Sequence, residues 1–377
     1  MATFSYDALN RRTGASYADA TVNYVRDPVG RLTQLTDSIG VTITNAYDTL
    51  DRLTSQTTAL GTVSYQYDIS SRRTQMTVPG QTPVTYTYDA ASRLTSITQG
   101  SNVVQFAYDA ANRRSRLTLP NGVSTEYSYD ASAQLTALTY KIGTTAIGDL
   151  QYAYDAGRNR IQVEGTWART GLPQVVSSAS YNANNQHLTF GSQSLTYDAN
   201  GNLTSDGTNT YTWDARNRLG AITGPAPASF IYDGRRARKT INGIVTDFVY
   251  DRFNLVQEQS GQTITNLMRG LMVDETFSRG DATTTVFLLS DVLGSTVALA
   301  DGAAGIPTTS LLSKLTGIGA VGRRLSGLVD ESESRARMRF PTSAVPITQG
   351  PALLASRGAP SGGRRTGDRA TPTDRDA

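Results

Sequence analysis

The feature that most constrains this chain is a short motif that recurs about every twenty residues. Residues 86–98 read YTYDAASRLTSIT, and residues 106–118 read FAYDAANRRSRLT. A copy consists of an aromatic residue, any residue, a second aromatic residue and an aspartate, usually with an arginine four positions after the aspartate. A fixed period of this length predicts a stacked repeat architecture in place of a series of ordinary domains.

Thirteen copies can be placed between residues 1 and 255. The anchoring residues are Asp7, Asp27, Asp48, Asp68, Asp89, Asp109, Asp130, Asp155, Asn182 in a diverged copy, Asp198, Asp214, Asp233 and Asp251. A single hairpin of this length is not stable alone in water, so the stability of the array must be collective. The sequence therefore predicts one all-β array of tandem hairpins in a curved antiparallel sheet.

Each position of a copy has a physical role. Aromatic residues two apart, such as Phe106 and Tyr108, lie on one face of a strand. An aspartate followed three residues later by glycine, asparagine or serine predicts a type I turn closed by a left-handed residue, and the arginine then opens the return strand. We expect the structural repeat residues to include Tyr67, Asp68, Tyr88, Asp89, Arg93, Tyr108, Asp109, Arg113, Tyr129, Asp130, Tyr197, Asp198, Trp213 and Asp214.

The return strand carries one irregularity. Leu94 and Ile97 are three residues apart, as are Leu32 and Leu35. A regular strand would place such residues on opposite faces, so the pattern predicts a β-bulge or a strand buried on both faces.

The residues offer little to a catalytic or metal site. The chain has no cysteine and one histidine, His187, which is interpreted as a substituted repeat position where other copies have arginine. The repeated aspartates lack the dense DxDxDG alternation of calcium loops, and each has a turn to cap and an arginine to pair with. We therefore expect no catalytic residue, no cofactor and no metal, although stacked aspartates in a polysaccharide-cleaving enzyme remain a distant alternative.

Composition divides the chain into three regions: the array at 1–255, a changed pattern at 256–309, and an arginine-, glycine-, proline- and serine-rich tail at 310–377. Residues 311–377 contain 11 basic and 6 acidic residues and a single aromatic residue, Phe340. The tail is predicted to be largely disordered because it cannot bury enough apolar surface. The array, with 24 basic and 26 acidic residues in positions 1–310, has no basic field for nucleic acid. No signal peptide or apolar membrane span is visible.

The copies YTYDAASRLTSIT, YTWDARNRLGAIT and LTYDANGNLTSDG resemble the YD repeats of bacterial Rhs proteins, which also occur in insecticidal toxin complexes and teneurins. Residues 287–301, FLLSDVLGSTVALAD, are similar to the opening of the Rhs core-associated region, with Asp291, Leu293, Gly294, Ser295 and Asp301 at the matching positions. The resemblance implies a β-sheet that spirals into a hollow, non-catalytic shell, which encloses or delivers a toxic C-terminal polypeptide. It also implies secretion or a place on the bacterial cell surface.

The partner implied by the resemblance is a toxin polypeptide or the remainder of an Rhs chain. The further core motifs expected after Gly305 are missing, so the chain is interpreted as an incomplete fragment without a working toxin, its tail being a recombined end or a frame-shifted reading of the gene. The alternative is that the tail is a small basic toxin. A second function class stays open, because exposed aromatic rings could bind cell-surface carbohydrate. Adhesion arrays that bind carbohydrate depend mainly on tryptophan, and this chain has only two, Trp167 and Trp213.

Overall fold

The computed structural model describes residues 2–168, 176 and 178–303, and within those residues the regular elements are all β-strands. Neighbouring strands pair in sequence order and antiparallel throughout. The predicted all-β hairpin architecture is therefore confirmed. The tail predicted to be disordered, 310–377, lies outside the described residues.

Three sheets share the strands. The first contains β1 (Thr3–Tyr6), β2 (Arg12–Ser16), β3 (Thr21–Arg26), β4 (Leu32–Asp37), β5 (Val41–Tyr47), β6 (Leu53–Thr58), β7 (Gly61–Tyr67), β8 (Arg73–Thr77), β9 (Val84–Tyr88), β10 (Leu94–Gln99), β11 (Asn102–Tyr108), β12 (Arg114–Thr118), β13 (Val123–Tyr129), β14 (Leu135–Ile142), β15 (Thr145–Tyr154) and β16 (Arg160–Glu164). The second contains β17 (Ala179–Tyr181), β18 (His187–Phe190) and β19 (Gln193–Ser194). The third contains β20 (Thr196–Tyr197), β21 (Leu203–Ser205), β22 (Thr210–Trp213), β23 (Leu219–Thr223), β24 (Ala228–Tyr232), β25 (Arg236–Ile241), β26 (Ile244–Asp251), β27 (Asn254–Ser260), β28 (Thr263–Arg269), β29 (Thr276–Gly280), β30 (Thr285–Ser290) and β31 (Thr296–Asp301).

The expectation of one sheet over residues 1–255 is not met among the described strands, which divide into three sheets. Residues 169–175 and 177, between the first and second sheets, lie outside the described residues. Residues 165–168 fold back onto β15. The backbone N–H groups of Thr166 and Trp167 both bind Asp149, and the Trp167 ring lies 4.6 Å from the Tyr140 ring. The third sheet, in contrast, runs from residue 196 to residue 301 without a break at 255, so the predicted boundary there has no counterpart in strand pairing.

The return strands contain the predicted bulge. In the β9–β10 pair, Thr87 faces Ser96 and Tyr88 faces Leu94, which leaves Thr95 as the extra residue. The extra residue lets Leu94 and Ile97 pack against the same hydrophobic core, although they are three residues apart. Equivalent register shifts occur in the other aspartate-turn hairpins, for example β11–β12 and β22–β23.

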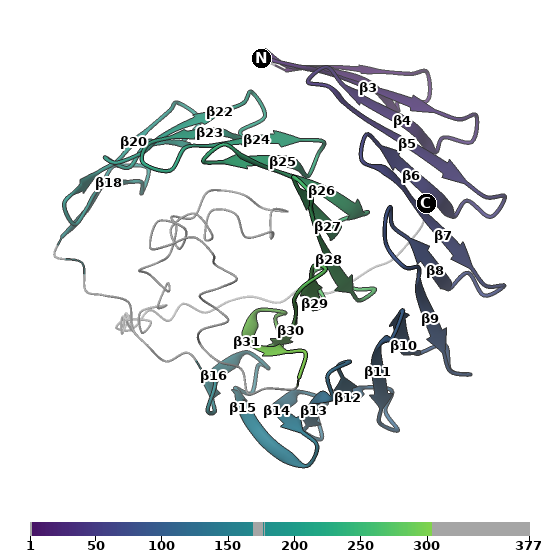
Figure 1. The fold of residues 1–377 in the computed structure, drawn as a ribbon. Coiled ribbons are helices and arrows are strands. Elements are labelled where there is room, and N and C mark those ends of the chain that lie inside the picture. The colour runs from purple at the N-terminus through teal and green to yellow at the C-terminus, as the bar shows by residue number, and fades with distance from the viewer. Residues whose placement is uncertain (1, 169–175, 177, 304–377) are drawn as a thin grey trace, which may run out of the picture.

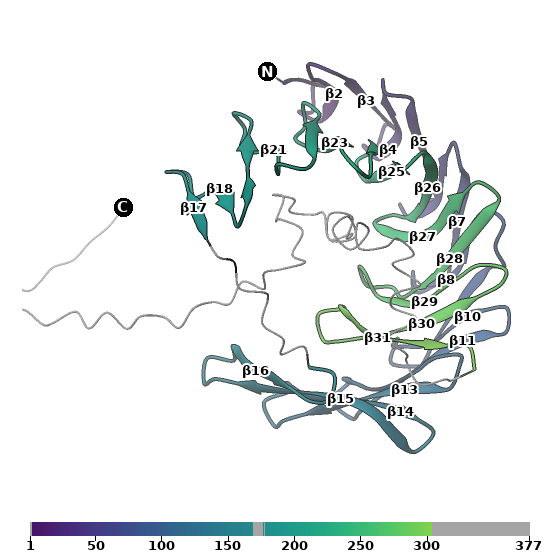
Figure 2. The ribbon, with the colours of Figure 1, turned by 60° about the vertical axis from the view of Figure 1, so that its left-hand side comes forward.

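The strands follow a spiral. We call β1–β16 the first coil and β20–β31 the second coil; in Figures 1 and 2 the strands β26–β31 lie inside the arc of the first coil. Contacts between the coils join residues about one turn apart, such as Arg73 with Asp251, Pro79 with Gln257 and Asn121 with Asp301, at sequence separations of 178, 178 and 180. Other contacts span less of the chain, such as Arg114 with Glu275 and Tyr140 with Ser290, at separations of 161 and 150. One turn of the spiral therefore takes roughly seven to nine repeats of the regular length.

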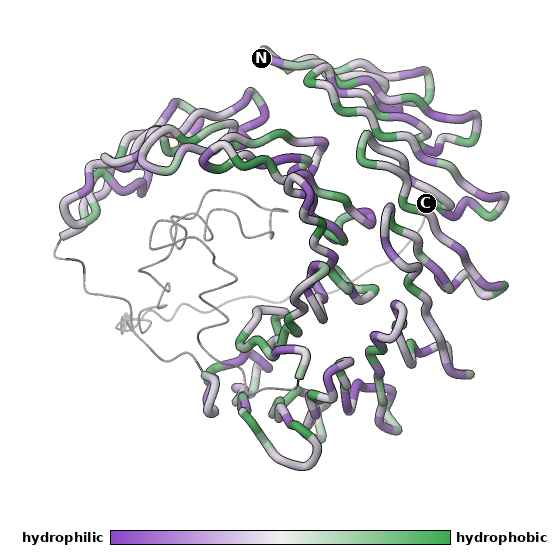
Figure 3. Tube along the Cα trace, in the orientation of Figure 1, coloured by the Kyte–Doolittle hydropathy of each residue, from purple (hydrophilic) through white to green (hydrophobic). Residues whose placement is uncertain are grey.

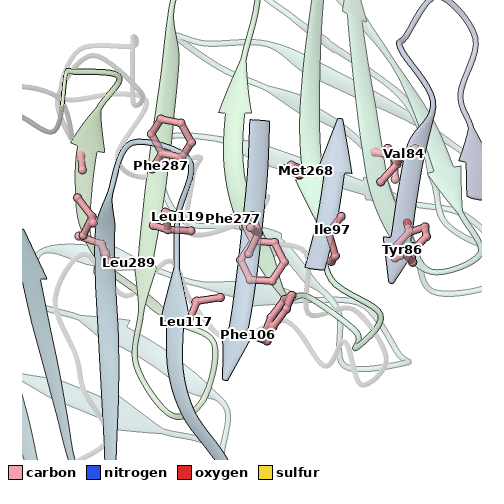
Figure 4. Close-up of a cluster of buried hydrophobic side chains, with 14 of the residues drawn as sticks. Val84, Tyr86, Ile97, Phe106, Leu117, Leu119, Met268, Phe277, Phe287 and Leu289 are labelled. Carbon is pink, nitrogen blue, oxygen red and sulfur yellow. The ribbon is translucent and has the colours of Figure 1, made fainter. Parts of the chain in front are cut away.

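The main hydrophobic core lies between the coils. Val84, Tyr86, Ile97, Phe106, Leu117 and Leu119 of the first coil meet Met268, Phe277, Phe287 and Leu289 of the second coil (Figure 4). Hydrophobic and hydrophilic residues are interspersed along the strands of both coils, as Figure 3 shows, because successive side chains point to opposite faces. A second cluster in β20–β25 includes Leu203, Tyr211, Ile222, Phe230 and Tyr232.

Candidate functional site

The aspartate of each regular repeat holds its turn through two oxygens. Asp89 Oδ1 accepts the Arg93 backbone N–H at 2.9 Å, and Asp89 Oδ2 accepts Arg93 Nε at 2.7 Å. The predicted left-handed residue is present in the turn, since Ser92 has a φ of 61°. The same ion pair joins Asp68 to Arg72, Asp109 to Arg113 and Asp214 to Arg218, each at 2.7 Å.

These bonds explain the acidity of the repeated carboxyl groups. The Arg93 backbone N–H and guanidinium stabilise the charged form and hold the pKa of Asp89 below its usual value. The pKa of Asp68 and that of Asp109 are lowered by the same groups of Arg72 and Arg113. Asp130 and Asp198 keep the turn with a partner that has no charge, because Gln134 and Asn202 stand in the arginine position.

The arginine also reaches the next repeat. The Arg93 guanidinium lies 5.0 Å from the centre of the Tyr108 ring, and its Nη1 donates to Asn112 Oδ1 at 2.9 Å. Arg72 makes the equivalent contacts with Tyr88 and Ser92, and Arg113 lies 4.4 Å from the Tyr129 ring. One side chain therefore closes its own turn and stacks on its neighbour.

The second aromatic residue binds in the opposite direction, to the preceding repeat. The Tyr108 hydroxyl donates to the Leu94 carbonyl at 2.9 Å, and burial raises the pKa of this hydroxyl. Tyr67, Tyr88 and Tyr129 donate in the same way to Leu53, Arg73 and Arg114. We call this repeating set of aspartate, arginine and second aromatic residue the turn ladder.

Trp213 and Tyr197 show that the second aromatic position needs a hydrogen-bond donor and a preceding return strand to accept from it. Trp213 replaces the tyrosine and donates its Nε1–H to the Leu203 carbonyl at 2.7 Å. Tyr197 lies in β20, the first strand of the third sheet, where no return strand of a preceding repeat is paired alongside. Its buried hydroxyl accordingly has no hydrogen-bond partner among the described residues.

The residues that resemble the core-associated region form another turn of the same kind. Asp291 Oδ1 accepts the Ser295 N–H at 2.9 Å, and Gly294 has a φ of 82°. Asp301 ends β31, and its carbonyl accepts a hydrogen bond from Asn121 of the first coil at 2.9 Å. The aspartate turn therefore recurs past residue 255, here without the arginine and the second aromatic residue of the turn ladder.

The interpretation of His187 needs a correction. The diverged copy is anchored by Asn182, whose Oδ1 accepts the Gln186 N–H at 3.0 Å, so Gln186 stands in the arginine position. His187 lies one residue later, paired with Tyr181 at a ring distance of 4.2 Å. The diverged copy has asparagine in place of the anchoring aspartate, which hides the spacing of four residues between Asn182 and Gln186.

Sequence reasoning missed three ion pairs that join the coils, which we call the seam pairs. They are Arg73 with Asp251 at 2.6 Å, Arg114 with Glu275 at 2.7 Å and Arg216 with Asp37 at 2.6 Å. Arg73 and Arg114 follow the turn arginine directly, where other copies have the core residue leucine. An arginine in that apolar position was the available signal that a carboxylate must lie opposite.

The described residues contain neither a metal-binding cluster nor a membrane-spanning helix. Within 2–168, 176 and 178–303, His, Cys, Asp and Glu side chains form no group of three that could hold a metal ion. The same residues contain no helix long and apolar enough to cross a membrane.

Comparison with known proteins places the chain in a family. The Teneurin YD-shell model matches residues 80–145 and 120–302, which together exceed half of the 377 residues, and the RHS repeat model matches 26–63 and 47–83. No curated protein matches the chain.

Solved structures cover most of the chain at low identity. A Photorhabdus luminescens Tc holotoxin pore is 15% identical over 81% of this chain and 24% of its own, with a TM-score of 0.47. A TcdB2-TccC3 crystal structure without its hypervariable C-terminal region is 14% identical over 81% of this chain and 19% of its own, with a TM-score of 0.39. The chain thus spans at most about a quarter of the length of these structures. From its turn ladder and the two family models that match it, the chain belongs to the Rhs/YD-repeat family.

Proposed function

We propose that this chain is a non-catalytic wall of an Rhs-type toxin-delivery shell, which surrounds a toxin polypeptide or the rest of a longer Rhs chain. The observation that carries the proposal is the spiral itself, in which the second coil returns against the first after 140 to 180 residues and is joined to it by the seam pairs. A curved wall whose successive coils are joined in this way is suited to containment.

The repeated aspartates support a structural role. In each regular ladder carboxylate both oxygens accept hydrogen bonds within the same turn, as those of Asp109 do from the Arg113 backbone N–H and Nε. A general acid or nucleophile needs an oxygen directed at a substrate, and the same geometry in successive repeats singles out no copy for such a task. We assign residues 256–301 to the same wall, because β27–β31 continue the sheet and its turns.

Carbohydrate binding, the alternative function, has no support from the two tryptophans. Trp213 is half-buried in the turn ladder, and Trp167 packs on Tyr140. A secreted or cell-surface location goes with the proposed delivery function.

Limited trypsin digestion of the full chain tests enclosure. Residues 311–377 contain 11 lysines and arginines, so an accessible tail is cut at once. We expect the tail of the intact chain to be cut slowly and that of the Arg73→Met variant, which breaks a seam pair, to be cut faster. The Arg116→Met variant, altered on the polar face, serves as the matched control. Equal and immediate cleavage in all three proteins would refute enclosure.

A further inference from the structure

Three adjacent turns of the second coil expose an apolar row that the ladder does not use. Its members are Phe253 between β26 and β27, Leu271, Met272 and Val273 between β28 and β29, and Val292 and Leu293 between β30 and β31. Phe253, Met272, Val273 and Leu293 are 65 to 75% exposed. We call these six residues the apolar turn row.

The row is held in place by the fold. Asn254 Nδ2 donates to the Met272 carbonyl at 3.1 Å, and Asn254 Oδ1 accepts the Asp274 N–H at 3.0 Å, so the first two turns are tied together. Glu275 anchors the second turn to Arg114 of the first coil. The Val292 N–H of the third turn donates to the Tyr152 hydroxyl at 3.4 Å. A braced apolar surface needs little ordering when a partner binds.

The central turn also departs from the repeat. Ladder turns of the first coil expose at most one large apolar residue each, such as Leu50 or Ile69, whereas residues 270–275 read GLMVDE and expose three in a row. Three consecutive exposed apolar residues lower solubility without any gain in packing, so such a run marks an interaction surface.

Charge identifies the partner. Arg252 and Asp274 are exposed beside the row, and neither forms an ion pair within the described part of the chain. Asp291, next to Val292, adds a second carboxylate beside the row. The apolar residues are thus flanked by one arginine and two aspartates, and Arg252 of one copy can pair with Asp274 of another under two-fold symmetry. An anionic lipid surface would instead favour an excess of positive charge.

We propose that the apolar turn row binds a second copy of this chain in a two-fold symmetric dimer, in which Arg252 of each copy faces Asp274 of the other. The inference goes beyond the proposed shell function and does not depend on it. Six apolar side chains are far fewer than the roughly 20–30 residues a side of a stable interface. The dimer is therefore weak.

Sedimentation velocity of the full chain from about 1 to 100 µM tests the dimer. We expect Met272→Ser and Leu293→Ser each to weaken association by about tenfold or more. Ile69→Ser is the matched control, because Ile69 is a fully exposed apolar turn residue of the first coil and lies outside the row. A chain that stays monomeric over the whole range, or a control as disruptive as the row variants, would overturn the proposal.

A charge reversal gives the sharper test. Arg252→Glu should weaken the dimer by placing like charges opposite one another, and adding Asp274→Arg in the same chain should restore it. Failure of this restoration would overturn the symmetric arrangement. Cosedimentation with phosphatidylcholine–phosphatidylglycerol vesicles that is lost in Met272→Ser, with no dimer in solution, would assign the row to a lipid surface instead.

Discussion

A ladder arginine such as Arg93 acts at three places through one guanidinium. It pairs with Asp89 in its own turn, stacks on Tyr108 of the next repeat and donates to Asn112 beyond that ring. Lysine could supply the charge, but its point-like ammonium lacks the flat fork needed to pair and stack together. The repeat therefore depends on the shape of arginine as well as on its charge.

The tyrosine hydroxyl offers a clean test of the ladder at the residue scale. Tyr108→Phe removes only the hydrogen bond to the Leu94 carbonyl, so the free energy of unfolding in urea should fall by about 1 kcal/mol. Tyr181→Phe is the control, since the Tyr181 hydroxyl has no hydrogen bond among the described residues and the ring is 56% exposed. Equal effects of the two substitutions would contradict a stabilising role for the ladder hydrogen bond.

The hairpin element combines a left-handed turn residue with a bulge on the return strand. The turn residue is asparagine, aspartate, serine or glycine in most copies, as at Asn10, Gly30, Asp51 and Ser92. The bulge then brings two residues of the return strand onto the core face, which increases the apolar area that each short hairpin buries. Short strands thereby reach a burial that their length alone would not allow.

One turn contains a residue poorly suited to its backbone. Ala133 has a φ of 63°, which costs a non-glycine residue about 1–2 kcal/mol. Ala133→Gly should raise the free energy of unfolding by about 0.5 kcal/mol, since part of the relief is offset by the greater freedom of glycine in the unfolded chain. Ala131→Gly, in the same turn but without a positive φ, should lower it. Thermal denaturation that gives the two variants the same sign would show that backbone strain at Ala133 is not relieved.

The whole molecule is held by contacts between coils as well as along the sheet. The shared core contributes most of the apolar burial, while the seam pairs set which repeat of one coil lies against which repeat of the other. Asp251 is 4% exposed in its side chain and Arg73 is 14% exposed, so each needs the other to offset the loss of water. Such pairs favour one register over others that would bury similar apolar area.

Breaking a seam pair should loosen the second coil. Arg73→Met leaves the buried Asp251 carboxylate without its cation, at a cost of about 3 kcal/mol. Hydrogen exchange measured by mass spectrometry should then become about 100-fold faster in β26–β31. Arg116→Met, on the polar face of β12, should leave exchange there unchanged. Unaltered exchange in the Arg73→Met variant would show that the pair does not secure the coil.

The sequence alone determined the parts of this protein that are local. The hairpins, the left-handed turn residues and the bulge could be predicted because each depends on residues within about twenty positions. The same local pattern also occurs in every copy, which makes it easy to recognise. The Asp89–Arg93 ion pair is one of these local, predictable features. The stacking of Arg93 on Tyr108 could not be predicted, although Tyr108 belongs to the next repeat, because a linear pattern does not give the distance between side chains of neighbouring repeats.

Only the tertiary structure decided how far the sheet curves and which copies meet. A periodic sequence leaves many registers nearly equivalent, so nothing in the repeat itself says that Arg73 must find Asp251 across 178 residues. The packing of Trp167 on Tyr140 is likewise a contact that the repeat pattern does not predict. Local patterns determine the hairpin, whereas curvature accumulated over several hairpins determines the spiral, because small differences in twist between strands add up over that distance.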